Sequence, residues 1–164
     1  VKIGKEVELE VLDTPGHTMT HICLLSKTDK PALFSGDTLF NAGAGNCHNG
    51  GHPEELYETF YRQFRNLPDT TLIYPGHDYL KNNLEFTLDR EPNNENAQKL
   101  LNSIKNSEAG SVITNLKMEN NINTFFRLSN STIIDRLREN FPELSSNPSQ
   151  KEVFLLLRQL RNKW

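Results

Sequence analysis

The first half of the chain alternates short apolar runs with turn residues, as strands joined by tight connections do. Apolar and acidic side chains alternate from Val7 to Leu12, which predicts a strand with one buried face. Compact apolar runs follow at 21–26 and 32–35, and a β-branched run at 70–74 ends before a Pro-Gly pair. Each of these runs is predicted to be a strand.

Helical spacing appears between the third and fourth of these runs. Pro53 suits the first position of a helix, and Glu54 and Glu55 favour a helix N-terminus. Apolar residues then recur at helical intervals until Pro68, which marks the predicted end. A second helix is predicted over 78–90.

Helical periodicity replaces strand periodicity in the second half of the chain. Helices are predicted around 97–104, after Ser131 and from Ser149. We therefore divide the chain into a strand-rich part, 1–92, and a helical part, 93–164. Strands and helices that segregate in this way predict an α+β fold.

Composition narrows the classes of function. The 164 residues include 18 Lys and Arg against 21 Asp and Glu, a net charge of -3, so no general nucleic-acid surface or anionic-membrane surface is indicated. No apolar run is long enough to span a bilayer. Cys23 lies in an apolar run and Cys47 in a loop, which indicates no disulfide framework. A reducing, cytoplasmic location is expected.

Three segments share one construction, a short strand followed by a glycine and then a side chain that can bind a metal. They place His17 after Gly16, Asp37 after Gly36 and His77 after Gly76. Ligands gather beyond the carboxyl ends of strands in open α/β sheets, and glycine allows the sharp turn. Two imidazoles and a carboxylate suit zinc, iron or manganese and leave positions open for water. A hydrolytic metal site is therefore predicted.

Other histidines fit different roles. Taken alone, His17, Asp37 or His77 would more often be an ordinary surface group after a turn. The metal-site prediction therefore depends on the setting that the three residues share. His21 lies inside a predicted strand and is interpreted as a core histidine that hydrogen-bonds backbone. His48, His52 and Cys47 could form a separate zinc site, but the Gly- and Asn-rich loop at 41–51 argues against the helix that would align the pair. We favour roles in a substrate loop.

The motifs together resemble the hydroxyacylglutathione hydrolase family, of metallo-β-lactamase fold, in order and spacing over essentially the whole chain. They are Thr14-Pro15-Gly16-His17-Thr18 with His21, Gly36-Asp37-Thr38-Leu39-Phe40, Gly76-His77-Asp78-Tyr79, Asn82-Asn83-Leu84 and Glu91-Pro92-Asn93. The resemblance implies half of an αββα sandwich over 1–92, followed by a helical substrate-binding domain over 93–164.

The resemblance also implies a binuclear metal site. His17 and His77 would bind separate metals and Asp37 would bridge them, with zinc expected first and iron or manganese as alternatives. The family's first metal motif, Thr-His-X-His-X-Asp-His, does not occur in the chain and is expected to precede Val1. This chain would then hold an incomplete site, would be inactive by itself, and would need the N-terminal half of the same protein as its partner.

Substrate-binding residues follow from the resemblance as well. Tyr79, Arg158 and Arg161 match positions that contact glutathione in the family, and the two arginines share one helix face. A solvated cationic face at the helix C-terminus is the competing interpretation of that pair. Asn46 and His48 stand where the family has a cation and a tyrosine. These two departures predict a specificity shifted away from a typical glutathione thioester.

The favoured function is hydrolysis of a thioester of a small thiol, in which the family's metal-bound hydroxide attacks the acyl carbon. The second hypothesis is an iron-dependent persulfide dioxygenase, which would use two His and one Asp. The helical extension after residue 93 argues against this hypothesis. The third is a metal-free, non-catalytic binding or assembly fragment. Neither nucleic acid nor membrane is expected as a partner.

Overall fold

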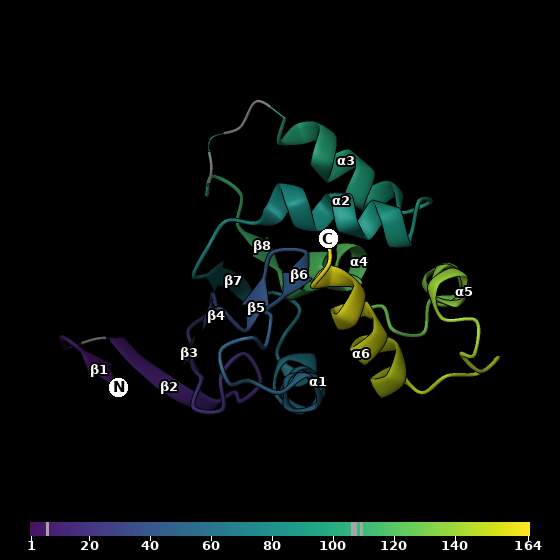
Figure 1. The fold of residues 1–164 in the computed structure, drawn as a ribbon. Coiled ribbons are helices and arrows are strands. Elements are labelled where there is room, and N and C mark those ends of the chain that lie inside the picture. Colours follow the sequence, from purple (N-terminus) through teal and green to yellow (C-terminus); the bar gives the residue numbers. More distant parts are fainter. Residues whose placement is uncertain (6, 106–107, 109) are drawn as a thin grey trace.

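The computed structural model describes residues 1–5, 7–105, 108 and 110–164 (Figure 1). Its main feature is a six-stranded mixed sheet in the order β1-β2-β3-β4-β7-β8, beside a two-stranded β5-β6 hairpin. The strands are β1 (Lys2–Ile3), β2 (Val7–Asp13), β3 (Ile22–Ser26), β4 (Ala32–Gly36), β5 (Leu39–Phe40), β6 (Gly43–Ala44), β7 (Leu72–Pro75) and β8 (Thr114–Asn115). The predicted α+β fold is confirmed.

The helices begin where the sequence provides caps. They are α1 (Pro53–Arg62), a 3₁₀ turn (Phe64–Asn66), α2 (Leu80–Arg90), α3 (Glu95–Ser103), α4 (Leu116–Ile122), α5 (Ser131–Asn140) and α6 (Gln150–Arg161). Asn94, Asn115, Asn130 and Ser149 each accept a hydrogen bond from a first-turn N–H of α3, α4, α5 and α6 respectively. The first helix is shorter than predicted, because its last turn tightens into the 3₁₀ turn before Pro68.

One face of the sheet is covered by helices. Cys23 and Leu33 from the sheet, Leu56 from α1, and Phe154 and Leu157 from α6 belong to one buried cluster. Helices α2 and α3 pack side by side elsewhere in the molecule (Figure 1). The main cluster thus joins residues from both halves of the chain, and the division near residue 93 stays a prediction. In the described part of the chain, no helix is long and apolar enough to cross a membrane.

The other face of the sheet carries a row of apolar side chains. Strand register pairs Val11 with Leu24, Leu24 with Phe34, and Phe34 with Tyr74, so these four side chains share one face across β2, β3, β4 and β7. The Phe34 and Tyr74 rings stack at 5.4 Å, yet Val11 remains 46% and Phe34 44% exposed. Exposed apolar rows of this kind drive association.

We therefore expect the isolated chain to self-associate through this face. Phe34→Lys should shift it towards monomer in light scattering after size exclusion, because a charge in the row opposes burial. Tyr61→Lys is the matched control, since Tyr61 is 49% exposed on α1 and lies outside the row. A parent chain that is already monomeric at high concentration would contradict the expectation.

Candidate active site at the carboxyl edge of the sheet

Three strands that run in the same direction end at this edge. Strand β3 is antiparallel to both β2 and β4, and β4 is parallel to β7, so β2, β4 and β7 share one direction. The turns that follow them carry His17, Asp37 and His77. The sheet's topology brings the three side chains to one edge of the molecule.

The Asp37 carboxylate lies between the two imidazoles. Its Oδ2 is 3.8 Å from Nε2 of His17, and its Oδ1 is 3.5 Å from Nε2 of His77. Within the described residues, no group of three or more His, Cys, Asp or Glu side chains meets in a geometry that could hold one metal ion. The arrangement is thus two imidazole–oxygen pairs that share one carboxylate, and not three ligands around a single point.

His17 is held in the tautomer that a metal ligand needs. Its Nδ1 is 2.7 Å from the carbonyl oxygen of Asn46, which can only accept, so Nδ1 carries the proton. With the proton on Nδ1, the neutral ring has its lone pair on Nε2, the atom that faces Asp37. Fixing the ring through a backbone carbonyl is the usual way in which proteins orient histidine ligands. With metal–ligand bonds of about 2.0–2.2 Å, nitrogen–oxygen separations of 3.5–3.8 Å leave room for an ion, so the donor set fits a metal.

His21 fixes the backbone at Asp37. Its Nε2 accepts the backbone N–H of Asp37 at 3.3 Å, and its Nδ1 is 2.8 Å from the Thr38 hydroxyl and 3.0 Å from that of Thr14. Burial and the neighbouring His17 lower the pKa of His21, which favours the neutral ring that this pattern requires. The half-buried His21 hydrogen-bonds backbone, as predicted from the sequence, and it also contacts two hydroxyls.

Glycines let the edge pack closely. A Cβ on Gly76 would come within 2.6 Å of Oδ1 of Asp37, so a side chain there would displace the carboxylate. Gly36 has a φ of 50°, in the left-handed region, and a Cβ there would lie 2.8 Å from Nε2 of His21. The glycines of the repeated strand–glycine segments thus allow close approach as well as sharp turns.

A pocket of about 220 Å³ opens beside this edge and is lined by all five residues predicted to bind substrate. They are Asn46, His48, Tyr79, Arg158 and Arg161. Near the sheet edge, the Tyr79 ring stacks on His77 at 5.4 Å and meets Phe40 edge-on at 5.1 Å. Phe40 also lines this pocket, so the aromatic part of the pocket wall lies next to His77. We call this hollow the thiol pocket.

Comparison with known proteins identifies the family of the chain. A family model described as "Metallo-beta-lactamase superfamily" matches residues 1–77, and one described as "Hydroxyacylglutathione hydrolase C-terminus" matches residues 78–164. The second match covers more than half of the chain. The chain belongs to the hydroxyacylglutathione hydrolase family.

Proteins named hydroxyacylglutathione hydrolase match the whole chain. Hydroxyacylglutathione hydrolases of Polaromonas sp. and Nitrosococcus oceani are 61% and 59% identical to it over its full length, and the chain spans 63% of the length of each. A crystal structure of ETHE1 from Myxococcus xanthus superimposes with a TM-score of 0.54 at 26% identity, covering 98% of this chain and 56% of that one. The family model over residues 1–77 confirms the predicted metallo-β-lactamase part of the fold.

Arg158 of this hydroxyacylglutathione hydrolase family member is not a solvated cation. It is 4% exposed, and its Nη1 donates to the carbonyls of Ala44 at 2.6 Å and Gly45 at 2.9 Å. Burial, and to a lesser degree Arg161, lower its pKa to about 10, so it remains charged at neutral pH. Arg158 therefore fixes the backbone of β6 and the loop that carries Asn46.

We expect Arg158→Ala to lower the free energy of unfolding by about 2–4 kcal/mol, because two buried carbonyls lose their donor. Urea denaturation measures this loss. Arg65→Ala is the control, because Arg65 makes its hydrogen bond to Gln150 at the surface. A loss below about 1 kcal/mol in the Arg158 variant would contradict its role as the anchor of this backbone.

A second buried group holds the turn between β5 and β6, directly before the residues that Arg158 fixes. Glu119 on α4 is fully buried and accepts hydrogen bonds from the Ala42 N–H, the Thr114 hydroxyl and the Asn123 amide. Burial raises its pKa to about 7 against the opposing effect of these hydrogen bonds. Ala42 has a φ of 58°, an unusual conformation for a residue with a side chain, and Glu119 stabilises it there.

The sequence missed part of the pocket wall. Phe40, Asn83, Asn162 and Trp164 also line the thiol pocket. Helix α6 ends at Arg161, and Trp164 beyond it is 51% exposed, with its Nε1 donating to Asn82. The match at Asn82-Asn83-Leu84 was the signal that could have identified Asn83.

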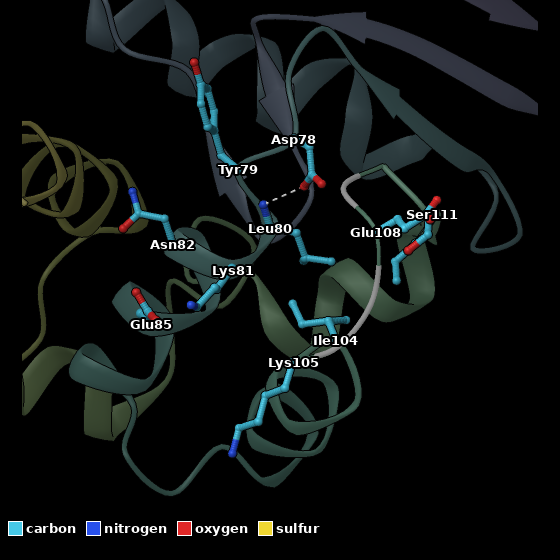
Figure 2. A pocket seen from close by; sticks show the side chains of 11 residues that line it. Asp78, Tyr79, Leu80, Lys81, Asn82, Glu85, Ile104, Lys105, Glu108 and Ser111 are labelled. Carbon is cyan, nitrogen blue, oxygen red and sulfur yellow. Dashed lines mark hydrogen bonds between the residues drawn. The ribbon is translucent and has the colours of Figure 1, made fainter.

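A separate hollow of about 460 Å³ lies between the start of α2 and the segment before β8 (Figure 2). Asp78 accepts a hydrogen bond from the Leu80 N–H there, and Lys81, Glu85 and Lys105 carry mixed charges along its wall. Of the predicted site residues, Tyr79 alone lines this hollow.

Proposed function

We propose that the protein is a metal-dependent hydrolase of thioesters of small thiols, with glutathione thioesters as the first substrate class. The observation that carries this proposal is the Asp37 carboxylate between His17 and His77, directly beside the thiol pocket. The names of the relatives and the 59–61% identity support the hydrolase assignment. The chain spans less than two thirds of those relatives, so the activity is proposed for the protein expressed from its complete gene.

In this proposal His17 and His77 would hold the metal ions, and Asp37 would be the carboxylate donor that they share. Zinc is the first expectation for nitrogen and oxygen donors, with iron or manganese as alternatives. A metal bound here supplies Lewis acidity to the thioester carbonyl and lowers the pKa of a water ligand. His17 is oriented by Asn46, and the Asp37 backbone by His21, so the donors are organised before the metal binds.

The thiol carrier occupies the thiol pocket, with its acyl end towards Tyr79 and His77. Arg161 provides a cation for a carboxylate of the carrier, and its guanidinium is already positioned by Asn83 at 3.1 Å. Asn46 and His48 complete the wall from the loop. The thiolate is a good leaving group, so no dedicated general acid is required of these residues.

The test is a product assay on the protein expressed from its complete gene. S-lactoylglutathione should be hydrolysed with release of free thiol, and a chelator should abolish the reaction. The rival persulfide dioxygenase would instead consume oxygen in the presence of glutathione persulfide. A metal-free binding fragment would do neither. Oxygen consumption without thioester hydrolysis would overturn the proposal.

Asn46 gives a test of carrier preference. The Asn46 side-chain oxygen accepts a hydrogen bond from the His48 N–H at 3.2 Å. The residues of the 41–51 loop that line the thiol pocket include no lysine or arginine. We propose that Asn46→Arg lowers the KM for S-lactoylglutathione about fivefold to tenfold, because a charge-assisted hydrogen bond adds about 1 kcal/mol or more. Asn46→Gln, which stays neutral, is the control. An unchanged KM in the arginine variant would mean that the loop departure is neutral.

A further inference from the structure

A second pocket of about 420 Å³ adjoins the thiol pocket. His48, Arg158 and Asn162 line both hollows, so these three side chains form a shared wall. The thiol pocket alone, at about 220 Å³, is smaller than the roughly 300–1,000 Å³ that ligand pockets usually measure. A ligand larger than the thiol pocket thus has this second hollow beside it, and we call the second hollow the side pocket.

Polar side chains without partners line the side pocket. His48, His52, Glu54 and Gln159 come from the loop, the start of α1 and the exposed side of α6. Among the residues that the structure describes, none of these four side chains has a hydrogen bond or ion pair. Most other polar groups near the site are engaged, as His17, Asn83 and Arg158 are. The side pocket thus has free donors and acceptors for a ligand.

The lining of the side pocket carries one acidic and one strongly basic side chain. Glu54 is the acid of the lining, in the first turn of α1, where the helix dipole favours a carboxylate. On the shared wall, Arg158 uses Nε for Asn162 and Nη1 for two carbonyls. Its Nη2 has no partner within the described part of the chain, which leaves donors for a carboxylate. One anion and one cation in a single cavity match an amino-acid zwitterion.

We propose that the side pocket binds the free amino-acid end of the thiol carrier, and that Glu54 determines specificity by pairing with its ammonium group. The inference rests on the proposed function, which places the thiol in the adjoining pocket. Arg158 is shared by both hollows, so the same guanidinium that fixes the loop also faces the α-carboxylate. A carrier whose amine is blocked would lose the Glu54 contact and keep the others.

Calorimetric titration with S-methylglutathione and its N-acetyl derivative tests the proposal. Both probes are thioethers without a thioester bond, so turnover does not affect the result. The protein should bind the free amine about fivefold or more tightly than the acetylated probe, as a charge-assisted hydrogen bond at a partly exposed site allows. Glu54→Gln should abolish that preference. Glu55→Gln should keep it, because Glu55 is the next residue of α1 and does not line the side pocket.

The outcomes separate this inference from the function on which it rests. Equal binding of both probes by the parent protein, or a preference that survives Glu54→Gln, overturns the role of Glu54 and leaves the thiol pocket intact. Binding of neither probe overturns both. Glu54 and Glu55 are both exposed in the first turn of α1, so each replacement should lower the melting temperature only slightly and by a similar amount, and similar melting temperatures confirm that both variants are folded.

Discussion

Replacing Glu91 with alanine is expected to lower the free energy of unfolding by about 3–5 kcal/mol, the usual cost of breaking a buried ion pair from one side. Glu91 is 3% exposed and accepts two hydrogen bonds from Arg127, at 2.6 and 2.8 Å. It also accepts the side-chain amides of Asn94 and Asn130. The variant leaves the Arg127 guanidinium without its counter-ion.

The loss should spread beyond the ion pair because Asn94 and Asn130 are also the N-caps of α3 and α5. Domains are stable by only about 5–15 kcal/mol, so the variant should be partly unfolded at moderate urea concentrations where the parent is folded. Urea denaturation followed by circular dichroism measures the difference. Glu95→Ala is the control, since Glu95 pairs with Lys99 on the surface and such pairs contribute about 0–1 kcal/mol. A loss below about 1 kcal/mol in the Glu91 variant would contradict the account.

The positions of the site residues could be predicted from sequence because they depend on local patterns. Glycine after a short strand marks a turn, and strand direction then places His17, Asp37 and His77 at one edge. The sequence could not show that the three side chains form two imidazole–carboxylate pairs that share Asp37. That arrangement depends on how far each turn extends beyond its strand. Their role as metal ligands stays a prediction.

The elements that the sequence missed are those fixed by tertiary contacts. Strands β1 and β8 have two residues each and exist because β2 and β7 offer free edges. Helix α4 has seven residues and a weak apolar pattern, and its capping Asn115 follows directly after β8. Short elements carry too few residues for periodicity to identify them.

Arg158 shows most clearly what could not be predicted from the sequence. Its position on the last helix was predicted, but its burial was not, because its partners Ala44 and Gly45 lie more than a hundred residues earlier in the chain. Glu119 is similar, since a lone glutamate in a polar helix gives no sign of full burial. Long-range hydrogen bonds of this kind hold the loop beside the thiol pocket, and sequence patterns do not encode them locally.

The most direct test of the central claim compares Asp37→Asn with the parent protein, expressed from its complete gene, for metal content and S-lactoylglutathione hydrolysis. Asparagine keeps the shape but removes the charge that two metal ions would share, so bound metal should fall and kcat should drop about 100-fold or more. Asp13→Asn, at the exposed end of β2, should change neither quantity. An Asp37→Asn protein with the parent's metal content and kcat would show that this sheet edge is not the active site.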